Sequence, residues 1–283
     1  MHIDLLLLPY DSARRDERMG AGPSALVAGG LRSRLEERGR RVHRVVAIEP
    51  PAESWRAEIR TAFELAAALA TEVRATRDTG RFPLVLTGNC GPAALGTMAA
   101  LPEDTPVLWT DAHGDFNTPE TTTGGFLDGM ALATLTGRCW TQLARAQIAG
   151  HVPVAEQRVW LLGARDLDPA EADALHRSAI HRVGADAIGA ELGEQLVREL
   201  TAGAEVRHPY VHVDLDVLDP SEGRANAYAA PAGVSLAALV ACCAIIGRGA
   251  PLAAATISAY DPAGDPDGRM VDAAVQIVDA LLG

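Results

Sequence analysis

The chain has 283 residues, of which 48% are hydrophobic and 22% are charged, a balance typical of a globular fold with a sizeable core. Its formal net charge is −12 and it contains no lysine, which argues against nucleic acid or an anionic membrane surface as a partner. No apolar run is long enough to span a bilayer, and the four cysteines lack the spacing of a disulfide framework, so we expect a cytoplasmic protein.

The hydrophobic pattern alternates between strands and helices along the chain. It predicts strands at 2–8, 41–48, 83–87, 106–110, 158–162, 180–184, 210–215 and 253–259. It predicts helices between them at 23–38, 53–77, 92–100, 169–178, 189–201, 236–246 and 270–282. Such alternation indicates an open parallel sheet with helices on both faces, in which ligands bind beyond the carboxyl ends of the strands. We treat residues 1–283 as one domain.

Two acidic clusters follow predicted strands. Asp111, His113 and Asp115 come directly after the apolar run at 106–110, and Asp214 and Asp216 close the run that begins at residue 210. Successive side chains of a strand face opposite ways, so this alternate spacing predicts that the members of each cluster project on one side. The clusters offer enough ligands for two divalent ions, and two ions imply hydrolysis by a metal-held hydroxide.

Four blocks of the sequence match, in order, those of a known enzyme family. Residues 111–119 read Asp-Ala-His-Gly-Asp-Phe-Asn-Thr-Pro, and residues 213–220 read Val-Asp-Leu-Asp-Val-Leu-Asp-Pro. Residues 163–169 and 22–31 provide the other two blocks. On these residues the chain resembles the arginase/agmatinase (ureohydrolase) family over nearly its full length. Around residues 115–130 it is also similar to the members that act on N-hydroxyarginine.

The resemblance implies both a fold and a metal centre. The fold would be a three-layer α/β/α arrangement around an eight-stranded, mostly parallel sheet, and the cofactor would be two bridged Mn²⁺ ions. Asp111 and Asp214 would bridge the two ions. His113 and Asp216 would complete one site, and Asp115 would belong to the other.

Three positions depart from the family pattern at the site. Cys90 stands where the family has a histidine ligand, so it is either a sulfur ligand or a small buried hydrophobe. Asp128 replaces a histidine that passes a proton to the leaving amine, and beside two cations its pKa should be lowered, which makes it a poor acid. Ala259 replaces a glutamate that pairs with the guanidinium.

These departures leave three interpretations open, two of which concern the role of Asp128. It is our candidate catalytic and substrate-binding residue, because its carboxylate could take over the pairing that Ala259 lacks. The substrate could instead be less basic than a guanidinium, such as a hydroxyguanidine or an amidine. The carboxylate of Asp128 could also simply hold its loop in shape.

Further substrate contacts are predicted from the loops after the strands. The resemblance implies that Asn117 and Asp168 meet the polar end of the substrate, and Phe126 makes one wall of the site more apolar. We expect Arg165 to support its loop through charge pairing and His212 to have a structural role.

The predicted function is a metal-dependent hydrolase of a linear carbon–nitrogen bond in a guanidino, hydroxyguanidino or amidine small molecule, releasing urea or hydroxyurea. The alternative is a family member that has lost catalysis and acts as a binding or regulatory protein. The partner would be the small-molecule substrate, with no nucleic acid and no membrane. The family also implies a homo-oligomer.

Overall fold

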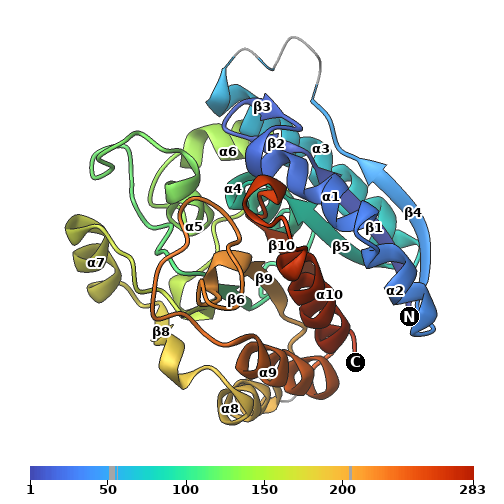
Figure 1. Cartoon of the computed structure of the whole chain (residues 1–283). Helices are drawn as coiled ribbons and strands as arrows, with labels where there is room; N and C mark the ends of the chain where they lie inside the picture. Colours follow the sequence, from blue (N-terminus) through green and yellow to red (C-terminus); the bar gives the residue numbers. More distant parts are fainter. Residues whose placement is uncertain (51–54, 56, 204–205) are drawn as a thin grey trace.

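A parallel sheet forms the centre of the computed structural model, which describes residues 1–50, 55, 57–203 and 206–283 (Figure 1). Its strands lie in the order β4 (Arg41–Ala47), β1 (His2–Leu8), β5 (Phe82–Thr87), β10 (Ala254–Ser258), β9 (Tyr210–Asp214), β6 (Val107–Thr110), β7 (Val159–Leu162) and β8 (His181–Val183). Every neighbouring pair is parallel. The eight predicted strands are therefore confirmed, and the antiparallel ribbon of β2 (Tyr10–Asp11) and β3 (Arg14–Arg15) was not predicted.

Helices cover both faces of the sheet, because alternate strand residues supply two separate cores. In β1, Leu5 and Leu7 point into one core while Leu6 and Leu8 point into the other. The first core is closed by α1 (Gly22–Ala28), α2 (Leu31–Glu37), α8 (Ala190–Thr201), α9 (Leu236–Gly249) and α10 (Arg269–Leu281). The opposite face carries α3 (Glu58–Asp78), α4 (Cys90–Met98), α5 (Ala131–Leu135), α6 (Thr141–Gln147) and α7 (Pro169–His176). The three-layer α/β/α fold is confirmed.

Each predicted helix lies where it was expected, but several begin or end at other residues than predicted. The helix expected at 23–38 is two helices, because Gly30 adopts a left-handed conformation (φ +101°) that ends the first and starts the second. Helix α3 begins at Glu58, and residues 53, 54 and 56 of the predicted helix lie outside the described residues. The short helices α5 and α6 were missed. No helix in the described ranges is long and apolar enough to cross a membrane.

The strand order decides where the site lies. Strands β5, β10, β9 and β6 are consecutive in the centre of the sheet, although they come from distant parts of the chain. Strand β10 pairs with β5 on one side and with β9 on the other. The segments that leave the carboxyl ends of these four strands therefore meet above the middle of the sheet.

Candidate metal centre and active site

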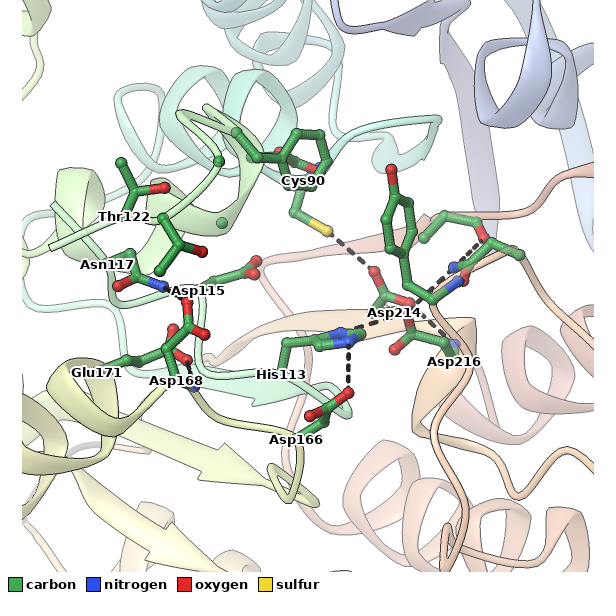
Figure 2. A pocket seen from close by; sticks show the side chains of 18 of the residues that line it. Cys90, His113, Asp115, Asn117, Thr122, Asp166, Asp168, Glu171, Asp214 and Asp216 are labelled. Carbon is green, nitrogen blue, oxygen red and sulfur yellow. Dashed lines mark hydrogen bonds and ion pairs between the residues drawn. The ribbon is translucent and has the colours of Figure 1, made fainter. Parts of the chain in front are cut away.

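The six predicted metal ligands lie together at the carboxyl ends of the central strands. Figure 2 labels five of them, which are Cys90, His113, Asp115, Asp214 and Asp216. Cys90 opens α4 directly after β5, and Asp214 is the last residue of β9. Donor atoms of one group lie within 4.8 Å of one another, and so do those of a second group that shares Asp111. The Cys90 sulfur is also 3.2 Å from an Asp214 oxygen. The first group is Cys90, Asp111 and Asp115, and the second is Asp111, His113 and Asp216.

Turns bring the members of each cluster together. The prediction that alternation along a strand would make these side chains project on one side was wrong. Strand β6 ends at Thr110, and the segment that follows is a loop in which Asp115 takes a left-handed conformation (φ +49°). Asp111 accepts a hydrogen bond from the backbone N–H of His113 at 2.8 Å. Asp214 accepts one from the N–H of Asp216 at 2.9 Å, where a 3₁₀ turn, η6 (Leu215–Val217), begins.

The cluster carries more buried carboxylate than its protein surroundings neutralise. Burial, reinforced by the neighbouring carboxylates, raises the pKa of Asp111, Asp115 and Asp214. The same two causes raise the pKa of the Cys90 thiol. Burial disfavours the charged ring of His113, but the hydrogen bond that the ring donates to Asp111 and the charge of Asp216 outweigh this and raise its pKa to about 9.

This donor set fits two divalent ions. Oxygen ligands dominate, as hard divalent ions prefer, and one imidazole and one softer sulfur complete the set. Buried carboxylates persist in proteins when they are paired or coordinate metals, and two divalent cations would favour the ionised forms that burial disfavours.

The sequence and the structure agree on the relatives of this chain. A sequence model of the arginase family matches residues 2–283. The chain belongs to the arginase family. It is 32% identical to an arginase of Bacillus caldovelox over 243 residues, which cover 78% of this chain and 77% of that one. Its structure matches the crystal structure of arginase from Bacillus cereus with a TM-score of 0.86 at 27% identity, over 100% of this chain and 99% of that one. The agmatine ureohydrolase of Thermoplasma volcanium shares the fold, with a TM-score of 0.72 at 17% identity over 99% of this chain and 88% of that one.

Membership of the arginase family confirms the predicted enzyme class, a hydrolase of carbon–nitrogen bonds in linear amidines. Metal-dependent hydrolysis of a guanidino-type carbon–nitrogen bond follows from the family. The narrower similarity to members that act on N-hydroxyarginine stays a prediction, because the relatives above are arginases and an agmatine ureohydrolase.

A cavity of about 370 Å³ lies above the ligands and is the candidate substrate site of this arginase-family chain. Its acidic wall includes Asp166, Asp168 and Glu171, which are labelled in Figure 2. Its apolar wall includes Phe126, whose ring stacks on that of Tyr228 with centroids 5.6 Å apart. The two rings come from different loops, so their contact joins the loops over the cavity.

Asp128 caps the helix that carries Cys90. One of its oxygens accepts the backbone N–H of Cys90 at 2.9 Å and the other accepts the N–H of Gly91 at 2.8 Å. Asp128 begins the 3₁₀ turn η3 (Asp128–Met130) and also lines the cavity. Among the protein groups alone, burial raises its pKa to about 7, opposite in direction to the lowered value expected beside two cations.

The two predicted polar substrate contacts lie side by side. The Asn117 side-chain amide donates to Asp168 at 3.1 Å, and its oxygen accepts from the Thr121 hydroxyl at 3.0 Å. Asp168 also caps α7, where it forms a capping box with Glu171. Glu171 in turn accepts the N–H of Phe116 at 2.8 Å, so this group ties the loop after β6 to the start of α7.

Sequence reasoning missed some residues of the site and misjudged one. Asn226 is buried and donates both to Asp216 at 3.1 Å and to the carbonyl oxygen of Ala259 at 2.9 Å. Asn226 and Tyr228 lie in an irregular segment without any periodic pattern, so the sequence carried no signal for them. Arg165 does support its loop, but through hydrogen bonds to four backbone carbonyls rather than the charge pairing that was expected.

Proposed function

We propose that this arginase-family hydrolase binds two Mn²⁺ ions and acts on a small molecule whose reacting group is less basic than a guanidinium. A hydroxyguanidine fits best, with hydroxyurea as the product. The reacting end of the cavity supports this choice, because it has little free counter-charge apart from the carboxylates proposed to hold metal. Ala259 carries no carboxylate, and each oxygen of Asp128 already accepts a backbone hydrogen bond. A less basic group needs less counter-charge when it binds.

The proposed ligand assignment follows the two donor groups. Asp111 belongs to both groups and Asp214 touches the Cys90 sulfur, so these two carboxylates would contribute to both ion sites. When bound, the two ions would supply a water of lowered pKa as nucleophile and would stabilise the negative charge on the attacking oxygen. Cys90 and Asp115 are proposed to complete one site, and His113 and Asp216 the other.

The chain's own groups hold these ligands in place. Asp111 accepts a hydrogen bond from the indole N–H of Trp109 at 3.0 Å, and Asp216 accepts one from Asn226. Partners of this kind fix ligand orientation, and losing one typically costs about 10- to 100-fold in metal affinity or activity. Asp128, through its hydrogen bond to the Cys90 N–H, is proposed to place the start of α4 rather than to transfer a proton.

The remainder of the substrate is proposed to lie along the two walls of the cavity. Asp168 with Asn117 offers oxygens for a cationic amine, and Phe126 with Tyr228 offers an apolar face for a carbon chain. The partner is therefore a small molecule. The homo-oligomer stays a prediction. The cytoplasmic location also stays one, in keeping with four free, buried cysteines.

The experiment compares matched substrates on the Mn²⁺-loaded protein. Bound metal is counted, and kcat/KM is measured for arginine and N-hydroxyarginine by release of urea or hydroxyurea. We expect two ions per chain and at least about a tenfold preference for the hydroxyguanidine, which corresponds to about 1.4 kcal/mol in transition-state binding. A preference for arginine would refute the proposed substrate class. Two bound ions without release of either product would instead support the non-catalytic alternative.

A variant sharpens the same test. Ala259→Glu places a carboxylate at the reacting end of the cavity and should shift the preference towards the cationic guanidine. Ala263→Glu adds the same charge at an exposed position outside the cavity lining and should leave the preference unchanged.

A further inference from the structure

A row of buried polar side chains leads from Cys90 into the sheet. The Cys90 sulfur is 3.3 Å from the hydroxyl of Ser258, which is 3.1 Å from Nε2 of His212. On the other side of the ring, Nδ1 of His212 is 3.0 Å from the hydroxyl of Tyr210, which donates to Thr256 at 2.7 Å. None of the five side chains is more than 2% exposed.

The strand register builds this row. Thr256 lies opposite His212, and Ser258 lies opposite Asp214, where β10 pairs with β9. Residues two apart in a strand face the same way, so Tyr210, His212 and Asp214 share one face. This is the face that α4 covers, and Cys90 is the first residue of α4.

His212 has little freedom to move. Its ring stacks on Trp109 with centroids 4.0 Å apart and planes at 10°, and the same Trp109 donates to Asp111. Because both ring nitrogens have partners, the imidazole is held by packing on its face and by hydrogen bonds in its plane. The position of the Ser258 hydroxyl is thereby fixed as well.

A neutral imidazole has one donor and one acceptor, so the row has two consistent arrangements of its protons. In one, the Cys90 thiol donates to Ser258, which donates to Nε2 of His212. In the other, the Thr256 hydroxyl donates to Tyr210 and the Tyr210 hydroxyl turns its proton to Nδ1. Nε2 then donates to Ser258 and the Ser258 hydroxyl donates to the sulfur, which suits a thiolate. The hydroxyl also lies 3.3 Å from the carbonyl oxygen of Val213, which is a further acceptor.

In the part of the chain that the structure describes, the Cys90 sulfur has two hydrogen-bond partners, and only Ser258 can donate to it when Asp214 is ionised. Among the described residues, the hydrogen-bond partners of the Cys90 sulfur are Asp214 and Ser258. An ionised Asp214 that binds metal has no proton to give to a thiolate. Ser258 is then the group that can donate to it.

We propose that Ser258, held by His212, is a positioning residue that fixes the Cys90 sulfur and donates a hydrogen bond to it as a metal ligand. This inference rests on the proposed role of Cys90 in the metal centre. Hydrogen bonds of this kind orient a ligand and tune the bound metal. The predicted structural role of His212 is thus to hold the Ser258 hydroxyl in place beside the Cys90 sulfur.

The test uses Co²⁺ as a spectroscopic probe on the full-length protein, because a thiolate bound to Co²⁺ absorbs in the near ultraviolet. The wild-type protein should show this band, and Cys90→Ser should lack it. Ser258→Ala should bind Co²⁺ at this site about 10- to 100-fold more weakly and shift the band. His212→Gln keeps an amide group near the place of Nε2. Its Co²⁺ affinity and its band should lie between those of the wild-type protein and those of Ser258→Ala.

Thr134→Val is the matched control. It removes a buried hydroxyl that lies outside this row and donates to the carbonyl oxygen of Met130, so it should lower thermal stability but leave Co²⁺ affinity and the band unchanged. Wild-type affinity and an unshifted band in both Ser258→Ala and His212→Gln would overturn the inference. Absence of the band in the wild-type protein would overturn the inference too. If the wild-type protein shows the band but releases no hydroxyurea from N-hydroxyarginine, only the proposed substrate is contradicted.

Discussion

The role of Asp128 can be settled by removing its carboxylate. Asp128→Ala leaves the buried N–H groups of Cys90 and Gly91 without their acceptor. Asp128→Asn keeps one acceptor oxygen, but its amide N–H₂ group faces the other backbone N–H, which then has no acceptor. If the residue caps α4, both variants should be less stable and should hold metal beside Cys90 less tightly. The KM for a cationic guanidine should change little.

The magnitude follows from the two hydrogen bonds. A buried donor left unpaired costs about 1–3 kcal/mol. Two such donors give a loss of about 2–6 kcal/mol in the free energy of unfolding for Asp128→Ala. For Asp128→Asn, which leaves one donor unpaired, about half of this loss is expected. For a chain of this size the loss in Asp128→Ala lowers Tm by roughly 4–12 °C.

The assay is denaturant and thermal unfolding of the chelator-treated protein, followed by KM and metal occupancy of the Mn²⁺-loaded protein. Asp166→Asn is the matched control, because its carboxylate also lines the cavity but its side chain is 66% exposed. This variant should stay within about 0.5 kcal/mol of wild type. Wild-type stability of Asp128→Asn together with a tenfold rise in KM for arginine would refute the capping role and restore the pairing hypothesis.

Three further outcomes are expected. After metal removal, the free energy of unfolding should fall as pH rises from about 4 to about 7, because Asp128 holds its proton in the folded state up to a pKa of about 7 and releases it near 4 when unfolded. Stability that rises over this range, measured by thermal unfolding, would contradict this. Asn226→Leu should weaken metal binding at the His113 site about 10- to 100-fold by metal titration, with an unchanged Co²⁺–sulfur band as the control. Gly88→Ala should fail to fold, because its Cβ would lie 2.2 Å from the carbonyl oxygen of Tyr10, and a soluble variant with native circular dichroism would show that this contact relaxes.

The strands and the ligands were the most predictable parts of the protein. The central strands are mostly apolar, because both of their faces are covered, and they end at polar residues. Asp111 and Asp214 could therefore be placed at strand ends from sequence. The turns that aim their neighbours could not, because the left-handed conformation of Asp115 depends on contacts with distant segments.

The residues that support the ligands were harder to predict. Asn226 and Ser258 act through contacts across strands and loops that no local pattern encodes. Asp128 was identified, but the sequence could not show that its oxygens point at the start of α4, thirty-eight positions earlier in the chain. Long-range pairing of this kind belongs to the topology, which the order of elements along the chain does not specify.

The position of β10 has a consequence for how the protein matures. This strand leaves the ribosome after the other seven strands of the sheet, yet it fills the gap between β5 and β9. Until it inserts, Cys90 and Asp214 have no common framework, so the nascent chain holds only fragments of a metal site. We expect tight metal capture to be a late event that occurs only once the sheet has closed, with the ions then fastening the two halves of the sheet across the seam that closes last.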